Sequence, residues 1–475
     1  MFKTISKTVK NKLFFIISAA VAMAAVALVL YCYFLSRPFI GISFQEKNIN
    51  LTPEYTCDLQ DKMLDIADTE GNLIWQSDRD IKVQDVLALD LNMDGQNELA
   101  ILCWKKGKYG PDMPFWEEDD ISKWSQHIYL YELREGQIKA IWMASDIGLV
   151  AKEWKALKVG DIEAILIKDT NDTITMWRWD SWGLKMADST VDFVCVGDNL
   201  IQKSIYEQGL LNGKKFDYLY DDFKKEIKNV DFAVINQETI FVDKANMYSG
   251  YPSFGTPIEV GQAMADAGFN IITLATNHAL DKGRYGVNVT TSFYDEKGIT
   301  YLGARNESDE CESYKIIQKC GIKIACFNYT YGLNGVDTSD KAKEQDIVDV
   351  LPDRESLSKE IADARENADA VIVFIHWGNE YENEPNEEQR SLAQFMCDCG
   401  VDIIVGTHPH VIQPWEELTS SEGHKTIVYY SLGNFISGQN IEGTDIGGIA
   451  RFSIGYTMDG VGITAHSFEE FQLKY

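Results

Sequence analysis

Short apolar runs alternate with segments of helical periodicity from about residue 191 to the end of the chain. Runs of four or five largely apolar residues, separated by helices, are typical of buried strands in an open α/β sheet. We therefore expect an α/β domain over residues 191–475. The runs that define it lie at residues 192–196, 232–235, 271–274, 371–375 and 401–405.

Each of these runs ends at or next to a side chain that is able to bind a metal ion. Open α/β sheets bind their ligands at the carboxyl ends of the strands, so these side chains should meet at one edge. Carboxylate, amide and imidazole groups together suit Mn, Fe or Zn. The alternative is a set of loop histidines that only form hydrogen bonds. We predict one or two metal ions, held by Asp198, Glu238, Asn277, His376, His408 and His410.

The motifs around these residues are GD, NxE, NHxxDxG, HWGxEY, GxHPH and YSLGNF, in this order between about residues 190 and 440. This ordered set resembles the capsule-synthesis (CapA-type) family, which includes the membrane-anchored subunit of poly-γ-glutamate synthesis. That family belongs to the calcineurin-like metallophosphoesterase superfamily. The resemblance implies a calcineurin-like four-layer α/β/β/α sandwich with a metal centre at the sheet edge.

The resemblance also implies a role for each ligand. Asp198 would hold a first ion with help from His410, and Glu238 would bridge two ions. The second ion would be held by Asn277, His376 and His408.

Four further positions follow from the same motifs. His278 would lie beside the substrate as an acid or an anion contact. Superfamily members normally have a histidine two residues after the first aspartate, but here Leu200 stands there, so the first ion has fewer ligands. Arg284 is a possible anion contact. Asn434 either caps a turn or contacts the substrate.

The N-terminus combines a basic segment with a long apolar one. Residues 1–12 contain four lysines and no acid, and residues 13–35 form a run of 23 residues without a charge. A helix of this length spans the roughly 30 Å of a bilayer's hydrocarbon core. We expect a single-pass membrane anchor, with the N-terminus cytoplasmic and the bulk of the chain extracytoplasmic, because lysines stay on the cytoplasmic side. A cleaved signal peptide is the alternative, but residues 34–38 make a poor cleavage site.

Residues 36–55 are interpreted as a linker, and residues 56–190 as a separate β-rich domain. A weak repeat with a spacing of about 65 residues relates 74–102 to 141–166. Repeated β-units of this kind are typical of propeller blades. Three or fewer repeats are too few for a closed ring, so we expect an incomplete, partial-propeller-like domain or a β-sandwich.

One loop of this domain has the spacing of a calcium site. Residues 90–98 place side-chain oxygens at positions 1, 3, 5 and 9, and Gly95 permits the sharp turn. An EF-hand would need glutamate at position 12, where this chain has Ile101. An ordinary Asx-rich turn is the alternative. The calcium ligands would be Asp90, Asn92, Asp94 and Glu98.

The net charge of −29 argues against nucleic acid as a partner, because phosphates would be repelled. Two functions fit the remaining observations. The first is a metal-dependent, phosphoesterase-like hydrolase that acts outside the cell on a polyanionic polymer or a phosphate-containing substrate. The second is a non-catalytic subunit that binds the polymer within a membrane complex for capsule or poly-γ-glutamate synthesis.

Overall fold

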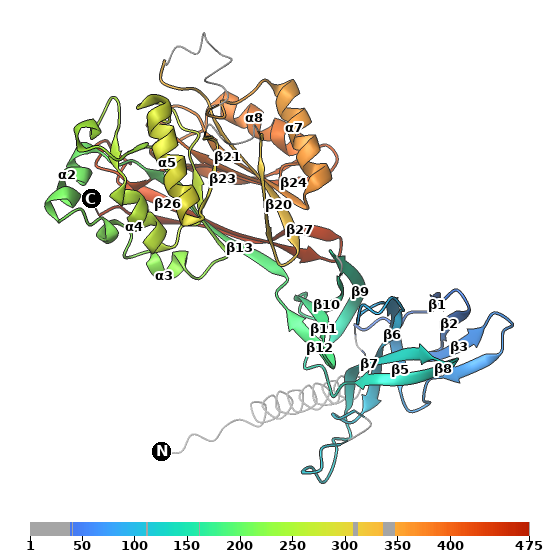
Figure 1. The fold of residues 1–475 in the computed structure, drawn as a ribbon. Helices are drawn as coiled ribbons and strands as arrows, with labels where there is room; N and C mark the ends of the chain where they lie inside the picture. The colour runs from blue at the N-terminus through green and yellow to red at the C-terminus, as the bar shows by residue number, and fades with distance from the viewer. Residues whose placement is uncertain are drawn as a thin grey trace, which may run out of the picture. The chain divides into compact units, whose positions relative to one another are not determined.

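The structure is a computed structural model, and its contacts divide the chain into two compact units that meet in the sequence between Ala187 and Asp188 (Figure 1). The expected cytoplasmic tail (1–12) and membrane segment (13–35) lie outside the described residues. Within the part that is described, no helix is long and apolar enough to cross a membrane. The described residues are 39, 41–110, 113–160, 162–306, 312–335 and 347–474.

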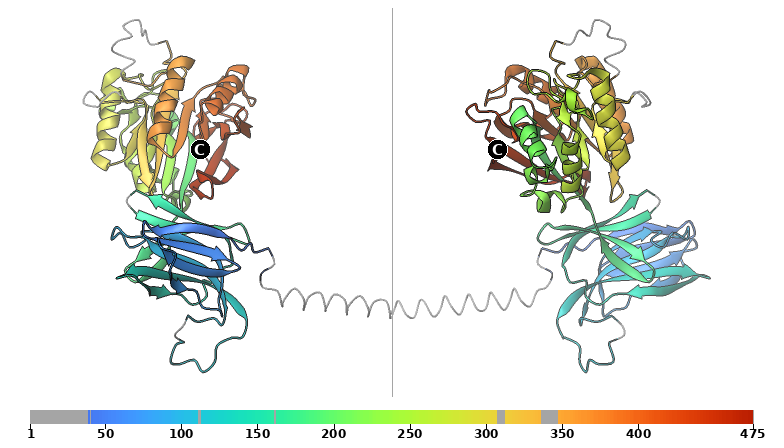
Figure 2. Two further views of the ribbon diagram at one scale, coloured as in Figure 1. Left: turned by 90° about the vertical axis from the view of Figure 1, so that its right-hand side faces the viewer. Right: turned by 60° about the vertical axis from the view of Figure 1, so that its left-hand side comes forward.

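The first unit contains three antiparallel sheets, each made of four strands that follow one another in the chain (Figure 2). The first sheet consists of β1 (Lys47–Thr52), β2 (Tyr55–Gln60), β3 (Met63–Asp68) and β4 (Leu73–Gln76). The second consists of β5 (Lys82–Leu89), β6 (Glu98–Lys106), β7 (Trp124–Arg134) and β8 (Gln137–Met143). The third consists of β9 (Ala151–Val159), β10 (Ile162–Asp169), β11 (Ile174–Asp180) and β12 (Gly183–Ala187).

Both faces of the second sheet are buried inside this unit. On β6, Leu99 and Ile101 pack with the first sheet, whereas Ala100 and Leu102 pack with the third. Successive side chains of a strand point to opposite faces, so a strand covered on both faces needs apolar residues at consecutive positions. This requirement explains the unbroken apolar run in β6.

The sequence repeat corresponds to strand pairs at the same position in two sheets, β5 with β6 and β9 with β10. The linker expected at residues 36–55 is corrected by the structure, because β1 pairs with β2 and belongs to the first sheet. Only Ile49 and Leu51 are apolar in β1, so its hydrophobic pattern was too short to predict a strand.

Seven strands form the first sheet of the second unit, in the order β18-β17-β14-β13-β26-β27, with β25 paired to β13. The pairs that join β13, β14, β17 and β18 are parallel, whereas β26 is antiparallel to β13 and to β27. The strands are β13 (Thr190–Asn199), β14 (Phe232–Asn236), β17 (Ile271–Thr273), β18 (Thr300–Leu302), β25 (Asn434–Ile436), β26 (Ile446–Thr457) and β27 (Gly460–Gln472).

Six strands form the second sheet of this unit, in the order β19-β20-β21-β22-β24-β23. The four central strands are parallel, and β19 and β23 are antiparallel edges. The strands are β19 (Lys315–Lys319), β20 (Ile322–Thr330), β21 (Ala370–His376), β22 (Ile403–Thr407), β23 (Ile412–Thr419) and β24 (Lys425–Leu432). A separate small ladder joins β15 (Phe241–Val242) to β16 (Thr256–Pro257).

Helices cover one face of each large sheet (Figure 1). Apolar side chains of α2, α4 and α5 pack on the first sheet, and those of α7 and α8 pack on the second. The predicted mixed α/β fold of this unit is therefore confirmed. The helices are α2 (Lys203–Leu211), α3 (Lys224–Ile227), α4 (Glu259–Ala267), α5 (Gly283–Lys297), α7 (Arg354–Asn367) and α8 (Glu387–Asp398), with short 3-10 turns at Asp217–Leu219 and Ala245–Met247.

The two large sheets contact each other through side chains and, at the edge where β13 ends, through backbone. The Tyr429 hydroxyl of β24 donates a hydrogen bond to the Ser467 carbonyl of β27, the last strand of the first sheet, at 3.2 Å. At the edge, a Cβ atom on Gly197 would lie only 1.9 Å from the Gly433 carbonyl oxygen, so only glycine fits. The same carbonyl accepts a hydrogen bond from the Asp198 N–H at 2.9 Å, which fixes the end of β13.

Candidate metal centre

The six predicted ligands lie together where strands of the two large sheets end. Three follow or terminate β13, β14 and β17 of the first sheet, and three terminate or follow β21 and β22 of the second. All six side chains are buried, with at most 3% of their surface exposed. They are Asp198, Glu238, Asn277, His376, His408 and His410.

A first group contains Asp198, Glu238 and His410. His410 Nδ1 lies 3.2 Å from Asp198 Oδ2, and His410 Nε2 lies 3.6 Å from Glu238 Oε1. One ligand atom from each of the three residues lies within 4.8 Å of the other two. Asn434 Oδ1 is 3.1 Å from His410 Nδ1 and holds the imidazole ring in place. The group therefore offers one position for a metal ion.

A second group contains Asn277, His376 and His408. His376 Nε2 lies 2.9 Å from Asn277 Oδ1 and 3.2 Å from His408 Nδ1. The other nitrogen of His376, Nδ1, lies 3.0 Å from the Thr407 hydroxyl, so Nε2 is the atom that faces the group. An amide oxygen and two imidazole nitrogens in contact offer a second position for a metal ion.

Glu238 is the residue whose environment fits a metal ion most clearly. Both of its carboxylate oxygens are buried, and neither has a hydrogen-bond partner among the described residues. A buried carboxylate without partners is costly unless a proton or a cation neutralises it. Burial accordingly raises the pKa of Glu238 to about 8. The donor atoms that surround it suit Mn, Fe or Zn, so these residues fit the predicted ions.

The three histidines of the two groups differ in charge. Burial lowers the pKa of His376 well below its ordinary value and that of His408 to about 3, so both are neutral, the form that binds metals. Burial also lowers the pKa of His410, but the carboxylates of Glu238 and Asp198 raise it by more, to about 9. Protonated His410 therefore pairs with these carboxylates, and a bound metal ion would have to displace its proton.

His278 lies beside the two groups and is held by a carboxylate. Its Nδ1 is 2.8 Å from Asp281 Oδ2, and the Phe254 ring stands edge-on to it at 4.7 Å between centroids. Burial lowers the pKa of His278, and Asp281 and Glu238 raise it by more, so the net shift is upward. This environment favours the protonated form, which is able to donate a proton or to contact an anion.

Sequence reasoning missed three residues that orient the site. Asn236 Nδ2 donates a hydrogen bond to Asp198 Oδ1 at 2.7 Å, and Thr407 contacts His376 as described above. Both residues lie at the ends of strands. A search for polar side chains at strand ends, which identified the ligands, would therefore also have identified them. Asn334 accepts a hydrogen bond from the Asn277 amide at 3.2 Å, but it lies in a loop for which the sequence offers no such signal.

A comparison with known protein families identifies the family to which this unit belongs. Residues 192–439 match the family described as bacterial capsule synthesis protein PGA_cap, which is just over half of the chain. The chain belongs to this family. The predicted resemblance to capsule-synthesis proteins is confirmed, and every candidate metal ligand lies within the matched range of the family.

Two Bacillus proteins show how far the family relationship extends. The chain is 32% identical over 253 residues to the capsule biosynthesis protein CapA of Bacillus anthracis. This match covers 51% of this chain and 59% of that protein. The chain is 37% identical over 180 residues to the PGA biosynthesis protein CapA of Bacillus subtilis. This match covers 38% of this chain and 45% of that protein. The chain therefore spans about half the length of the curated relatives it matches.

Solved structures give weaker matches. A novel phosphatase from Mycoplasma pneumoniae is 13% identical, with coverage of 60% of this chain and 95% of that chain and a TM-score of 0.37. The calcineurin-like phosphoesterase YfkN from Bacillus subtilis is also 13% identical, with coverage of 60% and 92% and a TM-score of 0.37. TM-scores this low do not decide the fold.

Three further positions from the sequence analysis lie within the PGA_cap range. Leu200 is buried at 2% exposure, so an apolar side chain takes the position where the superfamily pattern has a histidine ligand. Arg284 lies in the first turn of α5 and is half-buried. Asn434 is fully buried against His410, which is the contact expected of a supporting residue.

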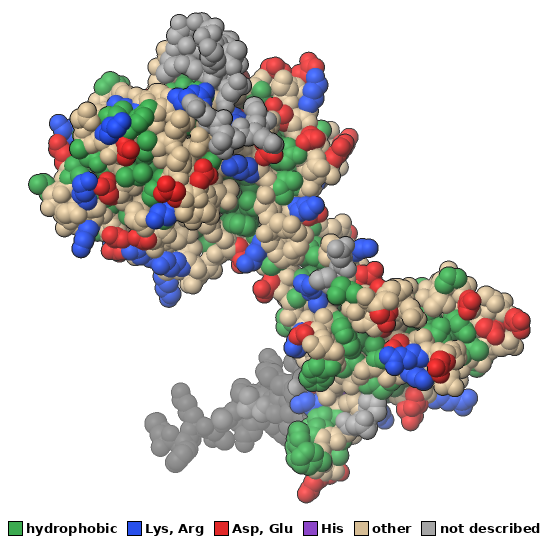
Figure 3. All heavy atoms as spheres, in the orientation of Figure 1, with side chains coloured by type: hydrophobic (Ala, Val, Ile, Leu, Met, Phe, Trp, Pro, Cys, Tyr) green, Lys and Arg blue, Asp and Glu red, His purple; other side chains and the backbone are tan. Residues whose placement is uncertain are grey.

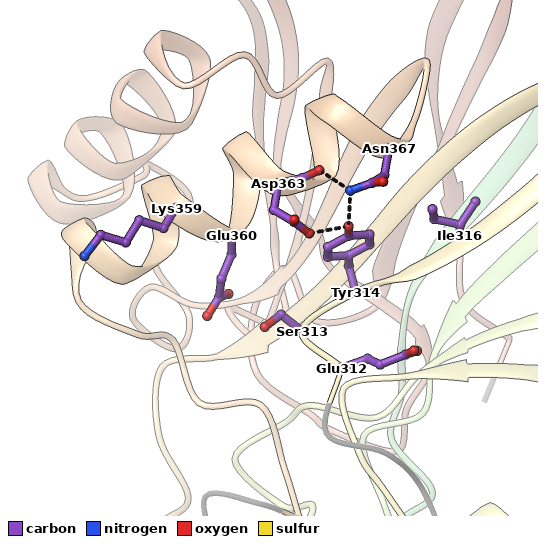
Figure 4. Close-up of a pocket in the computed structure, with 8 residues that line it drawn as sticks. All are labelled: Glu312, Ser313, Tyr314, Ile316, Lys359, Glu360, Asp363 and Asn367. Atoms are coloured by element: carbon purple, nitrogen blue, oxygen red, sulfur yellow. Dashed lines mark hydrogen bonds between the residues drawn. The ribbon is translucent and has the colours of Figure 1, made fainter.

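A pocket of about 650 Å³ lies elsewhere in the same unit, beside α7 and the start of β19 (Figure 4). Within it, the Tyr314 hydroxyl donates a hydrogen bond to Asp363 Oδ2 at 2.6 Å. Lys359 and Glu360 of α7 also line it, but none of the candidate metal ligands does. The size of this cavity therefore does not identify the candidate metal site of this unit.

The predicted calcium loop lies outside the PGA_cap range, between β5 and β6. Ligand oxygens of Asp90, Asp94 and Glu98 lie within 4.8 Å of one another. The loop is also closed by its own hydrogen bonds, including Gly95 N–H to Asp90 Oδ2 at 2.9 Å. Glu98 is almost fully buried, and burial, with repulsion from the two aspartates, raises its pKa to about 7. A calcium ion would relieve this repulsion, but the self-closed turn is also complete without one.

We predict that His376→Ala loses metal while the protein stays folded. The substitution removes a ligand at the sheet edge, and even the loss of supporting groups typically costs about 10- to 100-fold in metal affinity. Mass spectrometry of metal content, with circular dichroism for the fold, measures the effect. His466→Ala, at an exposed position on β27, is the matched control and should keep wild-type metal content. Full metal retention in His376→Ala would reject the centre.

We also predict that calcium raises the melting temperature of the first unit in the full chain, because an ion that binds only the folded state stabilises it. Asp94→Ala should abolish the shift, since it removes one of the clustered carboxylates. Glu153→Ala removes an exposed acid of β9 and should leave the shift unchanged. Differential scanning calorimetry with and without calcium is the measurement. A wild-type protein that calcium does not stabilise would favour the ordinary turn.

Proposed function

We propose that this chain acts in the synthesis or export of a capsule polymer of the poly-γ-glutamate type, through a metal-dependent hydrolase site in its second unit. Membership of the PGA_cap family and the names of the two Bacillus relatives support the polymer role. The substrate class that fits is a polyanionic polymer or a phosphate-containing compound. We also propose a calcineurin-like four-layer sandwich for this unit, supported by its two facing sheets and outer helices.

The buried carboxylate of Glu238 carries the proposal of a metal site. It lacks hydrogen-bond partners, and it belongs to the residues that form the first group, while His376 and His408 complete the second. Glu238, Asp198 and His410 would hold one ion, and Asn277, His376 and His408 would hold a second. Such ions, when bound, lower the pKa of water and stabilise negative charge that develops on the substrate.

The protein's own residues would position the substrate and move one proton. Burial lowers the pKa of His278, but Asp281 and Glu238 raise it by more, so His278 would donate a proton to the leaving group or contact an anionic oxygen. Arg284, near the start of α5, would add a positive charge for an anionic substrate. Asn434 would keep the His410 ring in position.

A non-catalytic polymer-binding scaffold is the second candidate function. The observation that favours it is Leu200, because its buried apolar side chain leaves the first group with Asp198, Glu238 and His410. In this function the site would bind the polymer as part of a synthesis complex and would not cleave it.

For location, we propose that residues 13–35 anchor the chain in the cell membrane as a single pass. Their charge-free length and the lysines of residues 1–12 support this proposal. The N-terminus would be cytoplasmic, both units would be extracytoplasmic, and other membrane subunits of a synthesis complex would be the partners.

The hydrolase function predicts turnover that depends on His278. The metal-loaded wild-type protein should cleave a chromogenic phosphodiester or poly-γ-glutamate, and His278→Ala should lose roughly 10²- to 10⁴-fold of this activity, the usual contribution of proton transfer. His278→Ala should retain metal, because His278 lies outside both ligand groups. His466→Ala again serves as the control. A metal-loaded wild-type protein that cleaves neither substrate would leave the scaffold as the function.

The membrane location predicts a protease result in intact cells. Protease added from outside should cleave the two units, and a tag placed before residue 1 should survive, because the membrane shields it. Permeabilised cells are the control, and there the tag should be lost as well. Immunoblotting of the tag and of the second unit gives the readout. Protection of the second unit in intact cells would contradict the proposed orientation.

A further inference from the structure

A second pocket, of about 690 Å³, lies in the first unit, outside the PGA_cap range. Its walls are the segment that links β4 to β5, the end of β6, and side chains of β7 and β8. Ligand sites commonly have volumes of about 300–1,000 Å³ and combine apolar walls with a few well-placed polar groups. This pocket has both features.

Two tyrosines of β7 present unpaired hydroxyls to this pocket. Tyr129 and Tyr131 both line it, and only 2% and 8% of their surfaces are exposed. Neither hydroxyl hydrogen-bonds to another group in the part of the chain that the structure describes. Burial raises the pKa of both, so they stay protonated and are able to donate. Hydroxyl donors that the protein leaves unpaired are available to an acceptor on a ligand.

The pocket also gathers positive charge. Arg79, Lys82 and Lys106 line it, and no described carboxylate lies within ion-pair distance of any of them. Lys105 lines it too, but its ammonium group donates to the carbonyls of Tyr109 and Gly110 at 2.6 and 3.1 Å. Elsewhere, on the face drawn in Figure 3, basic and acidic side chains are mixed. Unpaired cations are unexpected in a chain whose net charge is −29.

An aromatic wall and two acids complete the pocket. The ammonium groups of Lys82 and Lys106 lie 5.4 and 5.9 Å from the centre of the Trp124 ring, which fixes them at one side. Asp78 and Asp80 are the acids that line the pocket, so four cationic residues face two anionic ones. The charged residues that line the pocket are therefore net positive, and the tyrosine hydroxyls add neutral hydrogen-bond donors for an anion.

From this arrangement we propose that the pocket binds an anionic oligomer whose carboxylates are spaced along a flexible chain. Cations and hydroxyl donors would bind the carboxylates, and the Trp124 ring would pack against the methylene groups between them. The choice of a capsule-type polycarboxylate as the occupant rests on the proposed function. The first unit would thereby contact the polymer with its own site, without using the metal centre.

The test uses the full chain and a γ-linked hexaglutamate as the probe, with binding measured by isothermal titration calorimetry. Replacement of Lys82 and Lys106 by Gln should weaken binding about tenfold, because two unpaired charges are lost. Replacement of Lys139 and Lys158 by Gln, at exposed positions on β8 and β9, removes the same charge outside the pocket and should change the affinity less than about twofold. Circular dichroism checks the fold of both variants.

A second variant keeps charge and volume constant. Tyr129→Phe removes only the hydroxyl and should weaken hexaglutamate binding about tenfold, as expected for a lost hydrogen bond to a charged group. Unchanged affinity in both Tyr129→Phe and the Lys82/Lys106 variant would overturn the proposal. The proposal would also be overturned if a short polyphosphate bound more tightly than hexaglutamate and needed the same residues. Phosphate, and not carboxylate, would then be the group that the pocket prefers.

The metal centre is tested separately in the same experiment. His408→Ala should retain the part of hexaglutamate binding that Lys82, Lys106 and Tyr129 provide, because the pocket contains none of the metal ligands. A metal-loaded wild-type protein that binds hexaglutamate but does not hydrolyse poly-γ-glutamate would count against the hydrolase function alone. The opposite result would count against the pocket alone. In that result, the wild-type protein hydrolyses poly-γ-glutamate, but the pocket variants bind hexaglutamate with wild-type affinity.

Discussion

A carboxylate that is buried without hydrogen-bond partners must be neutralised by a proton or by a cation. Glu238 is in this situation, and the rest of the second unit is arranged around it. The protonated His410 supplies part of the compensation, at 3.6 Å from the carboxylate. A single imidazolium at that distance does not hydrogen-bond either oxygen, so the arrangement leaves room for a stronger positive charge. The neutral histidines, His376 and His408, are in the form that binds such a charge.

The site exists because two sheets end at the same place. The first sheet supplies acids and an amide, and the second supplies the three histidines, so neither sheet holds a complete ligand set. The sheets therefore have to stay in register at this edge. Gly197 allows the backbone contact with Gly433 that fixes the end of β13, and a side chain there would separate the two halves of the site. Gly406 allows an equally close contact between β22 and the Tyr430 carbonyl of β24, its neighbour in the second sheet.

The sequence was informative where burial makes its pattern simple. Strands such as β21 are buried along their whole length, so they are apolar throughout, and the first polar side chain after them marks the strand end. That rule located His376 and, with the family motifs, the other ligands. It did not locate Asn334, which reaches Asn277 from a loop with a left-handed backbone (φ 47°). Tertiary folding alone places such a residue.

The first unit was harder to predict for the opposite reason. In β4, Leu73 and Ile74 are exposed, and β1 has only two apolar residues, so the first sheet gives almost no periodic signal. The second and third sheets have longer buried strands, and these produced the repeat that was seen. The pocket beside Tyr129 was invisible for a related reason. Its residues come from four separate segments, and a tyrosine in an apolar strand is ordinarily a core residue whose hydroxyl reaches a partner.

Leu200 separates two questions that are easily confused, namely how tightly an ion is held and whether it can do chemistry. The first group offers Asp198, Glu238 and His410, and the second offers Asn277, His376 and His408. Leu200 adds no ligand to the first group, so an ion there would be held by three side chains. Catalytic sites, however, differ from structural ones in keeping a position open for water or substrate. Because Leu200 supplies no ligand, a metal position at the first group would stay open. Leu200 would thus weaken metal retention at this position without removing the condition that hydrolysis requires.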